Sequence, residues 1–161
     1  MRRLHYLKSV IEDQDGYRMF YHNGKPIHRE ADLQLMYKLT WCASIYDVNR
    51  EVNNGRGPVD FKVSKGSRDK TLIEFKLASN SKLKQNMKHQ VGVYEAANDT
   101  AKSIKAILYF SESEFRKVQT ILAELGLSGR RDVVLIDACA TNKPSASNVC
   151  DPQQGRLPWI E

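Results

Sequence analysis

The chain has 161 residues, enough for one domain with a buried core and too few for two domains of ordinary size. Hydrophobic residues make up 41% of it and charged residues 27%, proportions that exclude a disordered or a fibrous protein. The net charge of +6 suits a polyanionic partner but excludes the charge density of a histone-like protein.

The cysteines and the apolar runs bear on the compartment. Cys42, Cys139 and Cys150 are an odd number at wide spacing, which fits neither a disulfide framework nor a C-x-x-C metal site. The first residues carry no apolar run of signal-peptide length, and the longest apolar run, Val133 to Ile136, falls far short of the ~20 residues that span a bilayer. We therefore expect a cytoplasmic protein with no membrane partner.

Taken in chain order, the first about 25 residues and the tail after Val149 show no clear pattern, and we expect both to lie outside the core. Leu35, Leu39 and Cys42 recur at helical spacing and predict a first helix from Ile27 to Ala43. Three segments of strand character follow, separated by connectors rich in Gly and Asn: Ile45–Val52, Val59–Ser64 and Thr71–Leu77. Such connectors predict an antiparallel meander.

The second half of the chain alternates between helical and strand patterns. We predict a helix over Ser81–Asn98, a buried strand over Ser103–Phe110, a helix over Glu112–Leu125 closed by Gly126, and a last strand over Asp132–Cys139. This order predicts a single α/β domain, 1–161, whose mixed sheet is flanked by helices.

Two neighbouring strands carry the residues that point to chemistry. Glu74 and Lys76 are two apart and share one face of their strand, and Asp60 on the preceding strand can reach the same side by hairpin pairing. Two close carboxylates repel unless a cation lies between them, and Mg²⁺ is held by one or two carboxylates, waters and substrate phosphates. The pattern indicates phosphodiester hydrolysis with Mg²⁺, or Mn²⁺ as a substitute; the alternative is a solvated strand face with a cross-strand ion pair.

These residues resemble the motif of the PD-(D/E)XK nuclease superfamily. The family core is an αβββαβ unit with an acidic residue on its second strand and E-x-K on its third, and Asp60 and Glu74-Phe75-Lys76 match in type and order. Gln90 and Tyr94 have the Gln-x-x-x-Tyr form of the branch typified by RecB-type and phage exonucleases. The resemblance implies a restriction-endonuclease-like fold over about 27–110, with extensions at about 1–26 and 140–161.

The resemblance also implies roles for further residues. Glu30 corresponds to a helix carboxylate that joins Asp60 and Glu74 in holding the metal, and Gln90 and Tyr94 would act beside the catalytic Asp60, Glu74 and Lys76. Each has an alternative: Glu30 suits the dipole of its own helix, and Gln90 and Tyr94 suit a core tyrosine with a hydrogen-bonding neighbour. Glu51 is a reserve acidic residue for which a cross-strand ion pair is the simpler explanation.

Basic residues beside this site are candidates for contacts with a phosphate backbone: Arg56, Arg68, Lys82, Lys84 and Lys88. The alternative is that these charges are merely solvated, as exposed basic residues are as a rule. Family frequency favours DNA over RNA. A nuclease this small resembles the effector of a defence, toxin or mobile-element system, which implies an inhibitor protein or an additional specificity domain as a partner. The alternative class is a nuclease-like module that binds nucleic acid or protein without cutting.

Overall fold

The computed structural model describes residues 1–42, 44–53, 58–65, 69–88 and 102–143. At its centre lies a five-stranded sheet in the order β3-β4-β5-β6-β7. Its strands are Asp47–Asn53, Pro58–Lys65, Asp69–Leu77, Lys102–Tyr109 and Val133–Asp137. β3, β4 and β5 pair antiparallel, whereas β5, β6 and β7 pair parallel. The predicted meander and the mixed sheet are confirmed.

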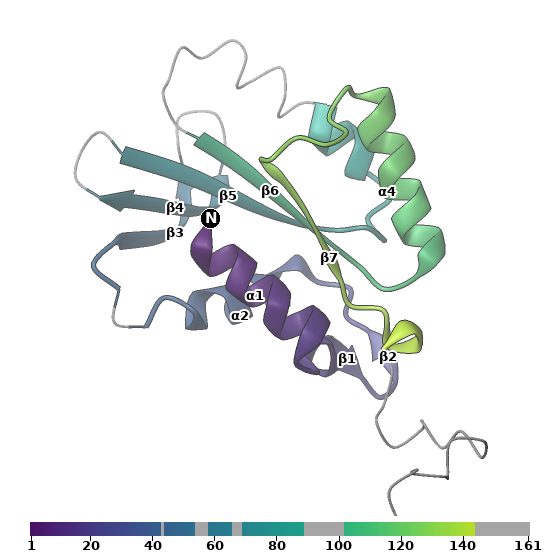
Figure 1. The fold of residues 1–161 in the computed structure, drawn as a ribbon. Coiled ribbons are helices and arrows are strands. Elements are labelled where there is room, and N and C mark those ends of the chain that lie inside the picture. The colour runs from purple at the N-terminus through teal and green to yellow at the C-terminus, as the bar shows by residue number, and fades with distance from the viewer. Residues whose placement is uncertain (43, 54–57, 66–68, 89–101, 144–161) are drawn as a thin grey trace, which may run out of the picture.

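Helices cover both faces of this sheet. They comprise α1 (Arg2–Asp13), α2 (Glu30–Leu39), the helical residues 83–88 and α4 (Glu112–Glu124). Figure 1 shows α1 and α2 on one side of the sheet and α4 on the other, and two separate buried clusters correspond to these two layers. The predicted α/β class with a helix-flanked mixed sheet is therefore confirmed. The predicted helix over Ser81–Asn98 is seen over 83–88, and its remainder lies outside the described residues.

The N-terminal segment belongs to the core rather than outside it. Leu4, Leu7 and Ile11 of α1 are fully buried in the cluster that α1 and α2 form with the sheet. Their spacing of three and four residues puts them on one helix face, so the helix buries a continuous apolar stripe. The expectation that this segment lies outside the core is wrong.

The buried face of α2 is also not the one that its apolar spacing indicated. Leu33 and Tyr37 are buried together with the polar Gln34, whereas Leu35 and Leu39 are more than half exposed. Residues three and four apart lie on one helix face, so the face that meets the sheet runs through Glu30, Leu33, Gln34 and Tyr37. The core side of α2 therefore presents two polar side chains to the sheet.

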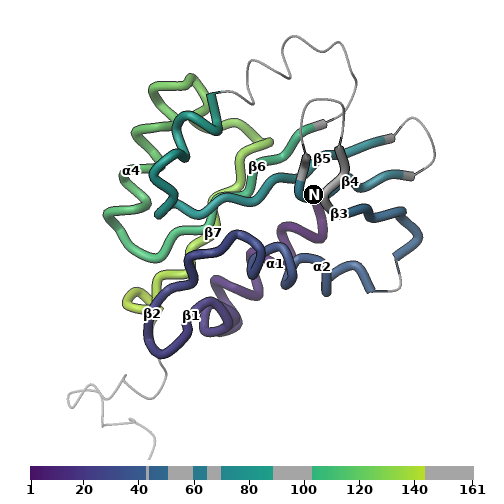
Figure 2. Tube along the Cα trace, turned by 180° about the vertical axis from the view of Figure 1, so that it is seen from behind, coloured from purple at the N-terminus to yellow at the C-terminus, as the bar shows by residue number. Residues whose placement is uncertain are grey.

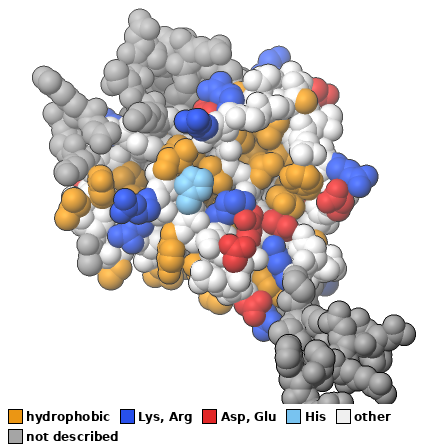
Figure 3. All heavy atoms as spheres, viewed as in Figure 1, with side chains coloured by type: hydrophobic (Ala, Val, Ile, Leu, Met, Phe, Trp, Pro, Cys, Tyr) orange, Lys and Arg blue, Asp and Glu red, His pale blue; other side chains and the backbone are white. Residues whose placement is uncertain are grey.

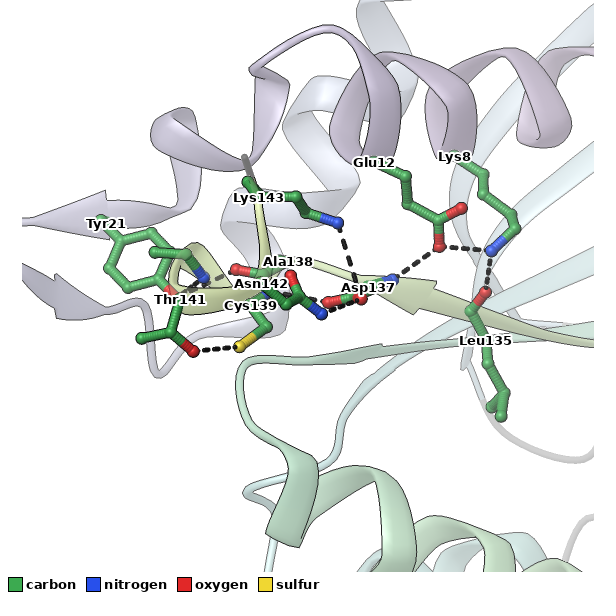
Figure 4. Close-up of polar contacts among 11 residues, drawn as sticks. Lys8, Glu12, Tyr21, Leu135, Asp137, Ala138, Cys139, Thr141, Asn142 and Lys143 are labelled. Atoms are coloured by element: carbon green, nitrogen blue, oxygen red, sulfur yellow. Dashed lines mark hydrogen bonds and ion pairs between the residues drawn. The ribbon is translucent and has the colours of Figure 1, made fainter. Parts of the chain in front are cut away.

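Side chains of α1 cover the outer edge of β7, which is the last strand of the sheet. Lys8 Nζ donates a hydrogen bond to the backbone oxygen of Leu135 at 2.7 Å, and the Asp137 N–H donates to Glu12 Oε1 at 2.8 Å (Figure 4). Lys8 and Glu12 are themselves an ion pair one helical turn apart. These contacts give partners to backbone groups of an edge strand, which otherwise invite pairing with another chain.

The carboxyl end of β7 is tied to the N-terminal quarter of the chain. Tyr21 lies in β1 (Tyr21–His22), which pairs with β2 (Lys25–Pro26), and its hydroxyl donates to the Ala138 oxygen at 2.9 Å. Figure 2 shows β1, β2 and the end of β7 at the same end of the molecule. Short 3₁₀ helices, η1 (Gly16–Phe20) and η2 (Ala140–Asn142), complete this end. Within the described part of the chain, no helix combines the length and apolarity needed to cross a membrane.

Candidate active site

Three elements bring predicted site residues to one place. Glu30 is the first residue of α2, Asp60 lies near the start of β4, and Lys76 lies near the carboxyl end of β5. The charges of Lys76 and Glu30 both act on the Asp60 carboxyl, and Lys76 Nζ lies 3.4 Å from Glu30 Oε2. The structure thus joins two carboxylates and an ammonium from the sheet and the first predicted helix.

Asp60 lies where β4 and β5 part. The pairing of β4 with β5 runs from Lys65–Asp69 to Phe61–Ile73, whereas its pairing with β3 continues as far as Pro58. Just past the last pair, the N–H of Phe75 donates to Asp60 Oδ2 at 2.6 Å. A side-chain carboxylate therefore takes the place that a backbone carbonyl of the neighbouring strand would have in a continuous ladder.

Burial dominates the electrostatics of Asp60 and raises the pKa of its carboxyl above the ordinary value of 3.8. The Phe75 N–H and the charge of Lys76 oppose this rise, and the nearby Glu30 carboxylate adds to it. The nearby Gln34 amide also lowers the pKa of this carboxyl. The carboxylate is thus held by donors but is repelled by a second carboxylate, and a cation would relieve that repulsion.

Glu30 turns its carboxylate toward the end of β5. Its Oε1 accepts hydrogen bonds from the Leu77 N–H at 3.4 Å and from Asn80 Nδ2 at 3.2 Å, and its Oε2 faces Lys76. As the first residue of α2 it also lies where a helix dipole favours an anion. The dipole interpretation and the site interpretation are therefore compatible, but the hydrogen bonds place both oxygens at the strand end.

The charges of the E-x-K strand are not a solvated face. The side chain of Lys76 is 13% exposed and Glu74 is 5% exposed. Burying a charge costs free energy unless other charges and hydrogen bonds compensate for it, so buried charges indicate a specific arrangement. The alternative of a solvated strand face is wrong.

Glu74 has a charged neighbour that sequence reasoning missed. It lies opposite Lys105 in the parallel register of β5 and β6, and both residues are 5% exposed. Burial lowers the pKa of the Lys105 ammonium, and the charge of Glu74 raises it in opposition. The register that joins them is set by the pairing of two distant strands, so no local pattern in the sequence indicates it.

Two side-chain amides support the site and were also missed. Gln34 lies buried on α2 four residues after Glu30, and Asn80 follows β5. The Asn80 amide donates to Glu30 through Nδ2 and accepts the Lys82 N–H through Oδ1 at 2.9 Å. Lys117 of α4 donates to the backbone oxygens of Ala78 and Asn80, which fixes this turn from the other layer. For Gln34 the sequence did contain a signal, because it lies four residues after Glu30 and therefore on the same face of a helix.

The remaining predicted residues have different outcomes. Lys82, Lys84 and Lys88 are exposed, and Lys84 pairs with Glu124 of α4 at 2.7 Å. Arg56, Arg68, Gln90 and Tyr94 lie outside the described residues, as does the side chain of Glu51. Figure 3 views the face that carries α1, where basic and acidic side chains are interspersed rather than gathered into one basic patch.

The chemistry of the donors limits the metal that this place suits. Carboxylate oxygens are hard ligands, and Glu30 and Asp60 supply them side by side. Within the described ranges, no three His, Cys, Asp or Glu residues form a group that could hold a metal. Two carboxylates are too few for a closed zinc site, but they fit Mg²⁺ or Mn²⁺, which keep waters and bind substrate phosphates.

The comparisons with known proteins bear on the same part of the chain. A family model with the description "Domain of unknown function (DUF8371)" matches residues 1–112. The chain belongs to the DUF8371 family. The DUF8371 match spans α1 to β6 and therefore includes Glu30, Gln34, Asp60 and Lys76, whereas β7 and almost all of α4 lie beyond it. A search of curated proteins finds no match.

Proposed function

We propose that this DUF8371 protein is a Mg²⁺-dependent nuclease of the PD-(D/E)XK type that hydrolyses phosphodiester bonds, with DNA as the substrate. The observation that carries the proposal is the convergence of Glu30, Asp60 and Lys76 at the point where β4 and β5 part. The αβββαβ order of the surrounding elements supports it, because the resemblance associates this order with that motif.

In this proposal the carboxylates of Glu30 and Asp60 would hold Mg²⁺, and Glu74, which lies opposite Lys105, is not among its ligands. When bound, the metal would lower the pKa of a water and neutralise charge on the phosphate. The chain's own contributions are positional. The Phe75 N–H holds the Asp60 carboxylate, and Asn80 and the Leu77 N–H hold that of Glu30. Defined ligand positions reduce the reorganisation that binding requires.

Lys76 supplies the remaining charge. Its ammonium lies beside Glu30 and acts on Asp60, so it faces the place where a phosphate would bind. An ammonium there stabilises the negative charge that builds up on the phosphate during in-line attack. The ion pair with Glu30 holds the Lys76 ammonium in place before substrate arrives.

The substrate backbone would run past residues 82–88. The backbone N–H of Lys82 donates to Asn80, whose amide contacts Glu30. The backbone of the exposed Lys82 therefore lies close to the site. Lys88 is exposed on the following helical residues. Both ammonium groups would contact phosphates without reading bases, which makes binding dependent on salt and independent of sequence.

The proposal is tested by incubating the purified chain with single- and double-stranded DNA and RNA in Mg²⁺ or Mn²⁺. We expect cleavage of DNA that a chelator abolishes and that Lys76→Ala lowers at least about 100-fold. Arg116→Ala is the matched control, because Arg116 lies on the exposed face of α4, where its side chain forms an ion pair with Glu112. Binding of DNA without cleavage under all these conditions would favour the non-cutting module, and cleavage by Lys76→Ala at the wild-type rate would contradict the assigned site.

A further inference from the structure

One oxygen of the Glu30 carboxylate already faces a cationic side chain. Oε1 accepts two hydrogen bonds, from the Leu77 N–H at 3.4 Å and from Asn80 Nδ2 at 3.2 Å. Oε2 faces the Lys76 ammonium, whose Nζ lies 3.4 Å away. A carboxylate oxygen has two lone pairs, so both of those on Oε1 are engaged. A cation that binds Glu30 must therefore use Oε2, which is the oxygen beside Lys76.

The ammonium and a metal ion would compete for this oxygen. Both are cations, and two positive charges within a few ångströms of each other repel. Water screens this repulsion only in part, because the side chains of Lys76 and Glu30 are 13% and 25% exposed. Binding of either cation to Glu30 therefore weakens the binding of the other.

The ion pair between Lys76 and Glu30 is loose enough to be exchanged. A charged N–H···O contact in a protein typically spans about 2.7–2.9 Å, whereas this one spans 3.4 Å. A lysine carries its charge at the end of a flexible four-carbon stem, so Nζ can turn away from Oε2 while the backbone stays in place. The neighbours of Lys76 on β5, Phe75 and Leu77, are buried in the core and fix the strand.

We propose that Lys76 is a built-in competitor of the metal: its ammonium neutralises Glu30 in the metal-free protein, and metal binding releases it from Glu30 to the substrate phosphate. The inference rests on the proposed function, since it concerns the regulation of the same site. It gives the site an order of events, in which the ammonium becomes available to a phosphate after the metal is bound. It also explains how a partly buried carboxylate is compensated when no metal is present.

The competing explanation is that Lys76 holds Glu30 in place for the metal. The two explanations predict opposite signs for the effect of removing the ammonium. If Lys76 competes, its removal tightens metal binding. If Lys76 positions Glu30, its removal weakens metal binding, because the carboxylate loses a partner. The contacts of Oε1 favour competition, since the Leu77 N–H and Asn80 hold the carboxylate without Lys76.

The experiment measures the Mn²⁺ affinity of the full chain by isothermal titration calorimetry in the absence of substrate. We expect Lys76→Met to bind Mn²⁺ at least about 10-fold more tightly than the wild type, although it cleaves DNA more slowly. Lys76→Arg keeps the charge and should bind Mn²⁺ no more tightly than the wild type.

Lys62→Met is the matched control for the loss of a positive charge. Lys62 is a half-buried lysine two residues after Asp60 on the same face of β4, whereas the lysine that pairs with Glu30 is Lys76. This variant should change the Mn²⁺ affinity by less than about 3-fold.

Thermal melting gives a second readout and checks that each variant is folded. In chelator, Lys76→Met should melt below the wild type, because Glu30 loses its counter-charge. Mn²⁺ should then raise the melting temperature of Lys76→Met by more than that of the wild type, since the metal replaces the missing ammonium. Lys76→Gln, which is neutral but keeps a donor, decides the question if Lys76→Met does not fold.

The outcomes separate this inference from the proposed function. If the wild type binds Mn²⁺ and Lys76→Met binds it equally or more weakly, competition is wrong and the metal site stands. If Lys62→Met or Lys76→Arg binds as tightly as Lys76→Met, the ammonium beside Glu30 is not the cause, and competition is again wrong. If neither the wild type nor Lys76→Met binds Mn²⁺ at millimolar concentrations, the metal site and the competition both fail. Tighter binding by Lys76→Met together with a wild type that cleaves no nucleic acid would support competition and contradict the nuclease.

Discussion

The backbone N–H of Phe75 donates to the carboxylate of Asp60 at 2.6 Å, just past Phe61–Ile73, the last backbone pair between β4 and β5. In this contact a side-chain carboxylate replaces a backbone carbonyl as the acceptor between the two strands, and that carboxylate lies near the charges of Glu30 and Lys76. The opening between the two strands is thus part of how the site is built, because a continuous ladder would point the Phe75 N–H at a backbone oxygen instead.

Asp60→Asn should stabilise the metal-free protein at neutral pH. Burial raises the folded-state pKa of Asp60 above its ordinary value of 3.8, so the ionised carboxylate is disfavoured in the folded state. A group with a raised folded-state pKa stabilises below its unfolded pKa, and this contribution is lost as pH rises through the folded pKa. The advantage of Asp60→Asn in thermal melts with chelator should therefore be largest at pH 7 and shrink as the pH falls toward 4.

The same variant should lose the stabilisation that metal confers. Saturation at about 100 times the dissociation constant stabilises a folded protein by ~2.7 kcal/mol, and Mn²⁺ should do this for the wild type but not for Asp60→Asn. If Asp60→Asn melts below the wild type in chelator at pH 7, the ionised Asp60 carboxylate is not disfavoured in the metal-free protein. If Mn²⁺ raises the melting temperature of Asp60→Asn as much as that of the wild type, Asp60 is not a metal ligand.

Lys105→Met should be strongly destabilising, and a second substitution should reverse this. Lys105 and Glu74 are both 5% exposed and lie opposite each other on β5 and β6, so removing the lysine leaves a buried carboxylate without this counter-charge. Breaking a buried pair on one side costs about 3–5 kcal/mol, whereas replacing both partners is often neutral. Urea unfolding of Lys105→Met and of Lys105→Met with Glu74→Leu measures this. Equal stabilities of the two variants would show that the pair is not coupled.

Glu12→Ala should weaken the attachment of α1 to the sheet edge. Glu12 accepts the N–H of Asp137 and holds Lys8 beside the Leu135 oxygen, so its loss leaves backbone groups of β7 unpaired. An unsatisfied group of this kind costs about 1–3 kcal/mol, to be measured by urea unfolding. Arg116→Ala removes an equally spaced but exposed pair on α4 and should change stability by less than ~0.5 kcal/mol. Similar losses for both variants would refute the edge role.

The two faces of α2 should respond in opposite ways to substitution. Leu33 is completely buried, and Leu33→Ala should cost about 2–5 kcal/mol in the free energy of unfolding. Leu35 is 54% exposed, and Leu35→Ala should cost less than about 1 kcal/mol. The same loss at both positions would mean that the helix is rotated relative to the structure described here.

Local patterns predicted the parts of the fold that depend on local chemistry. The alternation of side chains in β4 and β5, and the turn residues between them, placed Asp60, Glu74 and Lys76 on adjacent antiparallel strands. The helix α4 was predicted within one residue, because it is followed by Gly126, which takes a φ of 66° that favours glycine.

Other features depend on contacts between distant segments. The orientation of α2 was predicted wrongly because its core side carries the polar Gln34 while Leu35 and Leu39 face outward, so apolar spacing alone indicates the wrong face. The burial of α1 was missed although Leu4 and Leu7 have helical spacing, since charged residues separate them. Lys105 could not be paired with Glu74 without the register of two parallel strands.

The most direct test of the central claim is a crystal of the wild-type chain soaked with Mn²⁺ and measured at the manganese absorption edge. The account predicts an anomalous peak between the carboxylates of Glu30 and Asp60. The peak should lie within about 2.0–2.3 Å of at least one oxygen of each carboxylate, or of an oxygen of one carboxylate and a water that bridges to the other. A fully occupied peak elsewhere, or none at a concentration that saturates binding in solution, would contradict it.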